Sequence, residues 1–356
     1  MAEGLARMLV ACGAEPVIFN EGLENLALRQ SIDRSSLRTL AASSLKRSAS
    51  RRRFEAFVQE LSGVDAIVIV ANVPISFSPG VFPNIELLRK RLPKVPIVNY
   101  DLHYLPTLDS WARLLLRGEI TKLTASDLSM FDKGRFGLER YDWYLMAAAG
   151  TEIPLPPGPQ PFSLIGLDLD DGTLYPDQRG EFRALIDFEQ DRGDYSRYRK
   201  AQLEALKLAG VPYTVLDGYY TRAEIREIYR HTSIYFLASA ESFGLPICEL
   251  QACGARIFLP NPYWAASHWL GRDLYTEREP ELSPNFVIYD DDGDKLAKRI
   301  EEVRQSFDAA AVRATFEQCQ PHLFHGDLAE MKSFLDKLGS GAIHAGLHEQ
   351  HRSIGR

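Results

Sequence analysis

Two glutamates, Glu241 and Glu249, bracket a short turn where an apolar strand predicted over 233–239 gives way to a helix. In parallel α/β proteins, the loops that follow the strands form the edge at which ligands bind. Gly244 permits a tight turn there, and Pro246 suits the start of the helix. The free N–H groups of a helix start favour a phosphate, while Glu249, expected in the first turn, could hold a ribose and Glu241 further hydroxyl groups. The simpler alternative is that Glu241 caps the loop and Glu249 complements the helix dipole.

A second stretch rich in acids, I-G-L-D-L-D-D-G-T-L-Y-P-D-Q (165–178), is similar to the D-x-D-G-T nucleophile motif of haloacid-dehalogenase-type phosphatases. In that chemistry the first Asp attacks phosphorus and the second, two positions later, is the acid/base. Counting back from the glycine places Leu169 at the nucleophile position and Asp171 at the acid/base position. Asp168 and Asp170 have the right mutual spacing, but Asp171 then intrudes before the glycine. The spacing therefore disfavours a phosphatase and indicates turn or linker residues.

Helices and strands alternate along both halves of the chain, which predicts two α/β lobes with parallel sheets. In the first half, helix-then-strand units are expected within 4–20, 54–72 and 84–105. In the second half the expected elements are strands at 182–188, 212–218, 233–239 and 256–260, and helices at 196–210 and 221–232. Between the halves, residues 151–162 hold five prolines in twelve positions, which predicts a break between lobes.

The predicted domains are therefore residues 1–158 and 159–338, followed by a disordered tail over 339–356. The proline-rich segment and the tail both lack a sequence pattern that would continue a helix or a central strand.

Composition restricts the classes of protein further. The 356 residues are 45% hydrophobic and 25% charged, as in a soluble globular protein, and the net charge of -7 argues against a nucleic-acid partner. The apolar runs are too short to span a membrane, and the four cysteines form no disulfide-like framework, which favours a cytoplasmic setting. The basic stretch over 46–57 could contact anionic lipid at the inner face of a membrane, although a solvated helix face explains it more simply.

The turn between the two glutamates resembles the E-x7-E donor-site signature of retaining GT-B glycosyltransferases of family 4. Glu241 and Glu249 match its glutamates, and the positions between and after them match at Phe243, Gly244, Leu245, Pro246, Ala252 and Gly254. The resemblance covers roughly the second half of the chain. It implies two Rossmann-like lobes that face a cleft, and a donor lobe in which Phe243, Gly244 and Leu245 lie against the sugar and diphosphate. It also implies that Glu249 holds the ribose, that Glu241 holds the donor sugar, and that neither a metal nor another cofactor takes part.

Several positions depart from that family pattern. Asp187 stands where the family usually has a diphosphate-binding Arg, while Arg192 could stand for the usual Lys. In the first lobe, Asp101 and His103 lie at a strand end where the family often has a functional His. The first lobe of the family usually opens with a strand and a glycine-rich loop; because this sequence begins at the expected helix, we expect either that this strand is missing or that the start is truncated.

The sequence thus predicts a glycosyltransferase that moves a hexose from a nucleotide diphosphate sugar to a glycan, lipid-linked or small-molecule acceptor with retention. A non-catalytic protein that binds sugar nucleotides is the alternative, and a phosphatase is the less favoured one.

Overall fold

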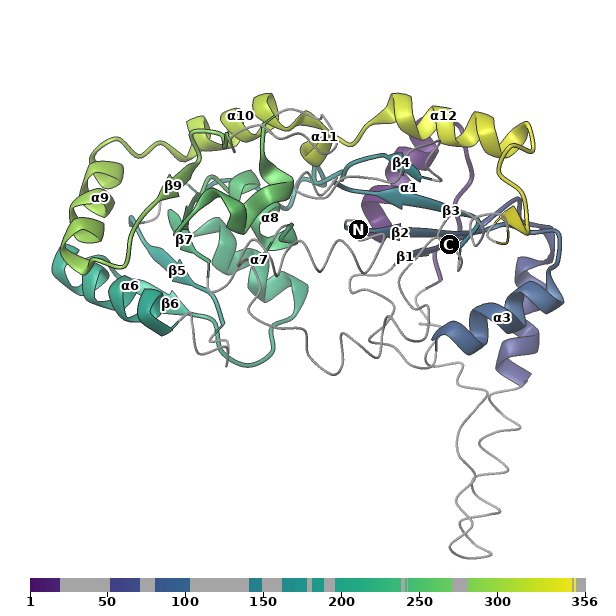
Figure 1. Ribbon diagram of the computed structural model, residues 1–356, viewed down its shortest axis with the longest axis horizontal. Coiled ribbons are helices and arrows are strands. Elements are labelled where there is room, and N and C mark those ends of the chain that lie inside the picture. Colours follow the sequence, from purple (N-terminus) through teal and green to yellow (C-terminus); the bar gives the residue numbers. More distant parts are fainter. Residues whose placement is uncertain are drawn as a thin grey trace, which may run out of the picture.

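The computed structural model describes residues 1–19, 52–70, 81–102, 141–148, 162–177, 181–188, 196–237, 241, 243–270, 281–347 and 349. Two lobes lie side by side, with the first sheet on the right and the second on the left of Figure 1. Both sheets are parallel, so the predicted α/β architecture with two parallel-sheet lobes is confirmed.

The first lobe contains a four-stranded sheet in the order β1-β2-β3-β4. Its strands are β1 (Ile67–Val70), β2 (Ile97–Asp101), β3 (Trp143–Met146) and β4 (Phe162–Leu164). One face packs against a helix over 52–60, the 3-10 turn η2 (Leu61–Gly63) and helix α3 (Val81–Arg91). The other face packs against α1 (Ala2–Ala11) and α12 (Leu328–Gly339). Because the sheet is covered on both faces, it needs apolar side chains on both, which explains why Ile97, Val98 and Tyr100 of β2 are all buried.

The second lobe contains a five-stranded sheet in the order β6-β5-β7-β8-β9. Its strands are β5 (Ala184–Ile186), β6 (Tyr213–Val215), β7 (Ile234–Phe236), β8 (Arg256–Leu259) and β9 (Phe286–Ile288). Its helices are α6 (Ser196–Ala209), α7 (Arg222–Arg230), α8 (Leu245–Ala252), α9 (Gly293–Gln305) and α10 (Ala309–Cys319), with the 3-10 segment η4 (Pro262–His268). Strands β5 to β8 and helices α6 and α7 fall within the ranges predicted from the sequence.

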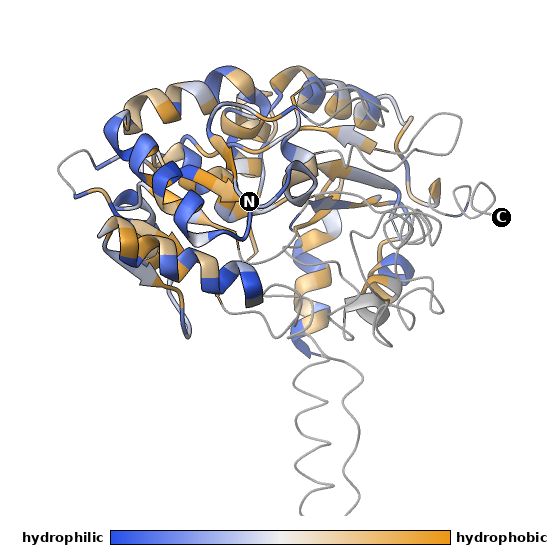
Figure 2. Cartoon of the chain, turned by 60° about the vertical axis from the view of Figure 1, so that its left-hand side comes forward, coloured by the Kyte–Doolittle hydropathy of each residue, from blue (hydrophilic) through white to orange (hydrophobic). Residues whose placement is uncertain are grey.

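Local sequence explains where several of these helices begin. Thr221 and Glu224 form a reciprocal capping box at the start of α7. Asp292, Asp308 and Asp327 each accept backbone N–H groups at the starts of α9, α10 and α12. Figure 2 shows hydrophobic and hydrophilic residues on separate sides of several helices, the pattern that buries one side of each against a sheet.

The C-terminal helices return to the first lobe. After α10, the short α11 (Pro321–Phe324) leads into α12, which packs against α1 and β4. Figure 1 shows α12 lying over the first sheet. The chain then continues in turns to residue 347, where Ile343 is only 2% exposed and the Gly346 N–H donates to Asp142 Oδ1 at 3.1 Å.

Three expectations from the sequence differ from these observations. The first lobe extends past residue 158, because β4 pairs with β3. Helix α12 belongs to the first lobe, and residues 339–347 of the expected disordered tail dock on it, because Ile343 is buried in the core cluster and the Gly346 N–H donates to Asp142. The strand expected after α1 is absent from residues 14–19, where Val17 is 71% exposed.

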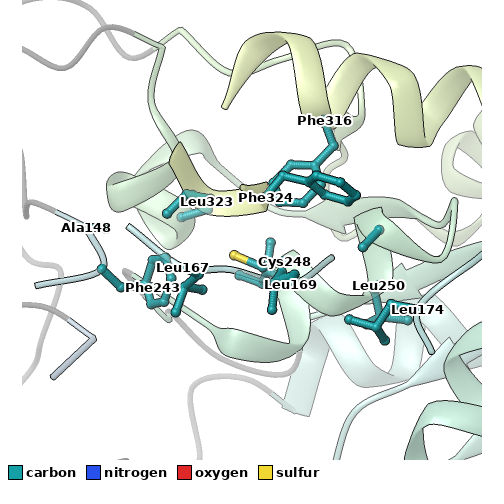
Figure 3. Close-up of a cluster of buried hydrophobic side chains, with 14 of the residues drawn as sticks. Ala148, Leu167, Leu169, Leu174, Phe243, Cys248, Leu250, Phe316, Leu323 and Phe324 are labelled. Atoms are coloured by element: carbon teal, nitrogen blue, oxygen red, sulfur yellow. The ribbon is translucent and has the colours of Figure 1, made fainter. Parts of the chain in front are cut away.

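Residues 165–177, here called the interlobe segment, connect the two sheets. Leu167, Leu169 and Leu174 are buried in a core cluster shared by both lobes, and Figure 3 shows them beside α8 and α11. Asp168 and Asp171 alternate with these leucines and point to basic side chains instead. Asp168 and Asp171 of the stretch 165–178 therefore form the polar side of a linker, as its spacing indicated.

Within the described ranges, no helix combines the length and the apolar character that a membrane span requires. Of the basic stretch 46–57, residues 52–57 open the helix over 52–60, with Phe54 buried and Arg52 and Arg53 exposed. This arrangement is that of a helix with one solvated face.

Candidate functional site

The turn that carries the two glutamates lies at the carboxyl edge of the second sheet. Strand β7, buried throughout, ends at Phe236, and helix α8 begins at Leu245 with Gly244 as its N-cap. Pro246 is the second helical residue, where its missing N–H costs no hydrogen bond. The sequence therefore placed this turn correctly, at the edge where parallel sheets bind ligands.

A backbone hydrogen bond fixes Glu241 at this edge, and its carboxyl group lies directly against Gly244. Its N–H donates to the Trp264 carbonyl oxygen at 2.9 Å. A Cβ on Gly244 would lie 2.8 Å from both Cδ and Oε2 of Glu241, so a side chain there would displace the carboxyl group. Gly244 thus permits a close approach, as predicted, but the group that approaches is Glu241 itself.

The carboxyl group of Glu241 is strongly perturbed. Burial is the main cause that raises its pKa from 4.5 to about 7, and the charge of Asp187 adds to the rise. Within the described part of the chain, no side chain or N–H donates a hydrogen bond to this carboxyl group. A buried carboxyl group without a donor is costly to keep, and such groups cluster at functional sites.

Asp187, at the end of β5, brings a second carboxylate to the same edge. It accepts from the Phe188 N–H at 2.8 Å, and the Arg199 side chain donates to its carbonyl oxygen at 2.6 Å. The buried Tyr229 and Tyr235 both have raised pKa values, mainly through burial and in part through the charges of Asp187 and Glu241. The negative charges of Asp187 and Glu241 therefore both raise the pKa values of the same two buried tyrosines, which places the two carboxylates near each other.

Glu249 makes an ion pair that sequence reasoning missed. Its Oε1 accepts from Arg226 Nη2 at 2.8 Å, and its side chain is 13% exposed. Glu249 is the fifth residue of α8 rather than a member of its first turn, so its effect on the helix dipole is small. Arg226 lies three residues before Tyr229 on the buried face of α7, a spacing that could have indicated a buried cation.

Phe243 faces the protein interior. It is 3% exposed and stacks on His268, with ring centroids 5.3 Å apart and an interplanar angle of 3°. Burial lowers the pKa of His268 to about 4, so this ring is neutral at physiological pH. The Phe243 ring is therefore packed in the interior, and its predicted contact with a donor sugar stays a prediction. Leu245 at the start of α8 is partly exposed.

In the first lobe, Asp101 ends β2 at the carboxyl edge of its sheet. Burial raises its pKa to about 6, although hydrogen bonds from the Leu102 N–H, at 2.8 Å, and from Asn99 oppose the rise. The next residue, Leu102, packs against the same core cluster as Phe243 and Ile247 of the second lobe. His103 and Arg192, also predicted as site residues, lie outside the described residues.

Several solved structures resemble the chain over most of its length. The calicheamicin glycosyltransferase is 15% identical with a TM-score of 0.37, over 94% of this chain and 89% of its own. HepE from Anabaena, solved with UDP and glucose, is 12% identical with a TM-score of 0.43, over 92% and 98%. A protein from Listeria monocytogenes, assigned as a UDP-N-acetylglucosamine 2-epimerase, is 9% identical with a TM-score of 0.46, over 96% and 86%.

No family model matches the sequence, and no curated protein matches it. Likeness at the level of these structures indicates no activity, so the function proposed below rests on the residues of the site.

Proposed function

We propose that the chain is a retaining glycosyltransferase that moves a hexose from a nucleotide diphosphate sugar to an acceptor without a metal ion. The observation that carries this proposal is the pair Glu241 and Glu249 at the carboxyl edge of the second sheet, on either side of a turn into a helix. The edge supplies what such a donor requires: carboxylates for hydroxyl groups and helix N–H groups for phosphate.

Each group of this turn has a proposed role. The N-terminus of α8, with Gly244 and Leu245, receives the diphosphate, and Arg192 assists it as a cation. Glu249 accepts ribose hydroxyl groups. Glu241 binds a hydroxyl group of the donor sugar, and a carboxyl group whose pKa is about 7 can donate or accept that hydrogen bond near neutral pH.

In the first lobe, Asp101 and His103 are proposed to contact the donor sugar from the opposite side. Retention is expected if the departing diphosphate oxygen takes the acceptor proton on the same face of the sugar, stabilised by the helix N-terminus.

The acids of the interlobe segment are engaged in ways that disfavour a phosphatase. Arg7 Nε donates to Asp168 Oδ2 at 2.6 Å, and Asp171 accepts from Arg226 at 2.7 Å. A carboxylate tied to a guanidinium is a weak nucleophile, because its charge is already compensated. Leu169, at the required nucleophile position, is buried.

One observation favours the second candidate, a protein that binds sugar nucleotides without transferring the sugar. Asp187 stands where a diphosphate-binding Arg is expected, and its charge raises the pKa of Glu241. A negative charge at that place would oppose the charge that develops on a departing diphosphate. Binding without transfer would follow if no other cation compensates it.

A ligand screen followed by a turnover assay separates these candidates. Thermal unfolding is measured with UDP-, GDP- and ADP-glucose, because a ligand that binds only the folded state raises the melting temperature. The donor that binds is then incubated with the protein with water as the acceptor: attack of water on the sugar breaks its bond to the diphosphate, and the released free sugar and nucleoside diphosphate are both measured. Binding with release supports the transferase, binding without release supports the second candidate, and no stabilisation by any of the three contradicts both.

A further inference from the structure

Arg226 is a buried cation that joins the interlobe segment to α8. Its side chain is 7% exposed. Nη1 donates to Asp171 Oδ2 at 2.7 Å and also to the Thr173 hydroxyl group, while Nη2 donates to Glu249 Oε1 at 2.8 Å. One guanidinium therefore connects the linker between the lobes to the proposed ribose ligand.

Arg226 and Asp171 keep their charges because each raises the stability of the other's ionised form. Burial by itself would lower the pKa of Arg226, but Asp171 and Glu249 raise it above its ordinary value. Burial would likewise raise the pKa of Asp171, but hydrogen bonds from Arg226 and Thr173 hold it well below its usual range. Both partners of the Arg226–Asp171 pair therefore stay ionised across physiological pH.

The two oxygens of Glu249 differ in their surroundings. Oε1 is occupied by Arg226, whereas Oε2 accepts no hydrogen bond from any described residue. A carboxylate held through one oxygen keeps the other in a fixed position, which lowers the entropy lost when a ligand binds.

A second arginine ties the interlobe segment to α8 independently. Arg313 donates to the carbonyl oxygen of Ala252, at 2.7 Å, and to that of Leu174. The segment is thus attached near the middle of α8 through Arg226 and at its end through Arg313. These two attachments keep Asp171 and Thr173 in a constant position relative to Glu249.

We propose that Arg226 is a positioning residue for nucleotide recognition: anchored by Asp171 and Thr173, it holds Glu249 Oε1 and presents Oε2 to a ribose hydroxyl group. This inference rests on the proposed function, since it assumes a ribose at Glu249. It assigns Asp171 and Thr173 of the interlobe segment a part in donor binding, although they do not touch the donor.

The test compares nucleotides with and without ribose hydroxyl groups. Affinities of the full chain for UDP, GDP and ADP, and for their 2′,3′-dideoxy forms, are measured by calorimetric titration for the wild type and Arg226→Gln. For the base that binds, the wild type should prefer the ribose form by about tenfold or more, the size expected for a charge-assisted hydrogen bond. In Arg226→Gln the preference should fall toward unity, while the affinity for the dideoxy form stays the same.

Two further variants keep the test decisive. Asp171→Asn removes the anchor but leaves Arg226, and should lower the ribose preference in the same direction even if Arg226→Gln does not fold. Arg222→Gln is the matched control: it loses pairs with Glu3 and Asp171 on the exposed side of α7 but touches no atom of Glu249, so its ribose preference should equal that of the wild type.

The outcomes are distinguishable. A wild-type preference that survives in Arg226→Gln and Asp171→Asn overturns the inference and leaves the proposed function standing. Equal losses of both nucleotide forms would make Arg226 purely structural and also overturn it. A wild type that binds none of the three nucleotides overturns the proposed function itself.

Discussion

Replacing Glu241 by Gln should stabilise the protein at neutral and alkaline pH. The carboxyl group is buried against Gly244, receives no hydrogen bond from a described donor, and lies near the charge of Asp187. Gln has nearly the same shape and carries no charge, so the change removes the electrostatic penalty and leaves the packing.

The magnitude follows from the pKa of Glu241. A pKa that rises from 4.5 in the unfolded chain to about 7 in the folded protein means that the folded state binds the proton more tightly. The ionised carboxylate therefore opposes folding: the penalty is small below the unfolded pKa, grows as the pH rises, and is complete above the folded pKa. At roughly 1.4 kcal/mol for each pH unit, the full penalty is about 3 kcal/mol.

Urea unfolding of the wild type and Glu241→Gln at about pH 5 and about pH 8 measures this difference. The variant should gain about 2 kcal/mol more over the wild type at the higher pH than at the lower one. Glu181→Gln is the control, because the Glu181 side chain is 69% exposed and its removal should leave the pH dependence unchanged. A Glu241→Gln variant that is less stable at pH 8, or that keeps the wild-type pH dependence, would refute the reasoning.

Three other substitutions test the site and the linker. Gly244→Ala should displace the carboxyl group of Glu241 and weaken nucleotide-sugar binding, because the added methyl group would lie 2.8 Å from that carboxyl group. The backbone of residue 244, at φ -102°, accepts alanine without strain. Gly339→Ala is the control: the space around Gly339 is open, so this variant should bind the nucleotide sugar normally in the same titration. Glu249→Gln should lower the affinity for the nucleotide by about tenfold or more through loss of a charge-assisted hydrogen bond; calorimetric affinities equal to the wild type would remove it from the site. Asp168→Asn should cost about 1 kcal/mol or less of unfolding free energy by weakening a partly exposed ion pair with Arg7, and should leave donor turnover intact; loss of a phosphorylated intermediate in this variant would instead support a phosphatase.

Elements with a local physical cause could be predicted from the sequence. The capping box at Thr221 and Glu224 and the positive φ of Gly13 after α1 mark helix ends through contacts a few residues apart. Apolar runs such as I-Y-F in β7 indicate strands buried on both faces. The strand expected at the end of the unit 4–20 is the exception: among the described residues Val17 is exposed, since an apolar run forms a strand only where a neighbouring strand can pair with it.

The position of the candidate site could also be predicted, but the partners of its side chains could not. A strand-turn-helix pattern places Glu241 and Glu249 at a sheet edge, whatever surrounds them. The contact of Glu241 with Gly244 involves neighbours in the chain, but the rise of its pKa depends first on burial by distant segments and then on the charge of Asp187, which follows strand β5.

The amino-acid sequence by itself determined the alternation of helices and strands, the parallel sheets that follow from it, and the turn that carries two carboxylates. Only the tertiary structure decided that Phe243 faces inward onto His268, that Arg226 holds Glu249, and that residues 339–347 dock on the first lobe. The reason is the range of the forces involved. Periodicity and capping act within a few residues, whereas burial and ion pairing depend on which distant segments the fold brings together: Asp171 and Arg226, for example, are 55 residues apart in the chain and 2.7 Å apart in space.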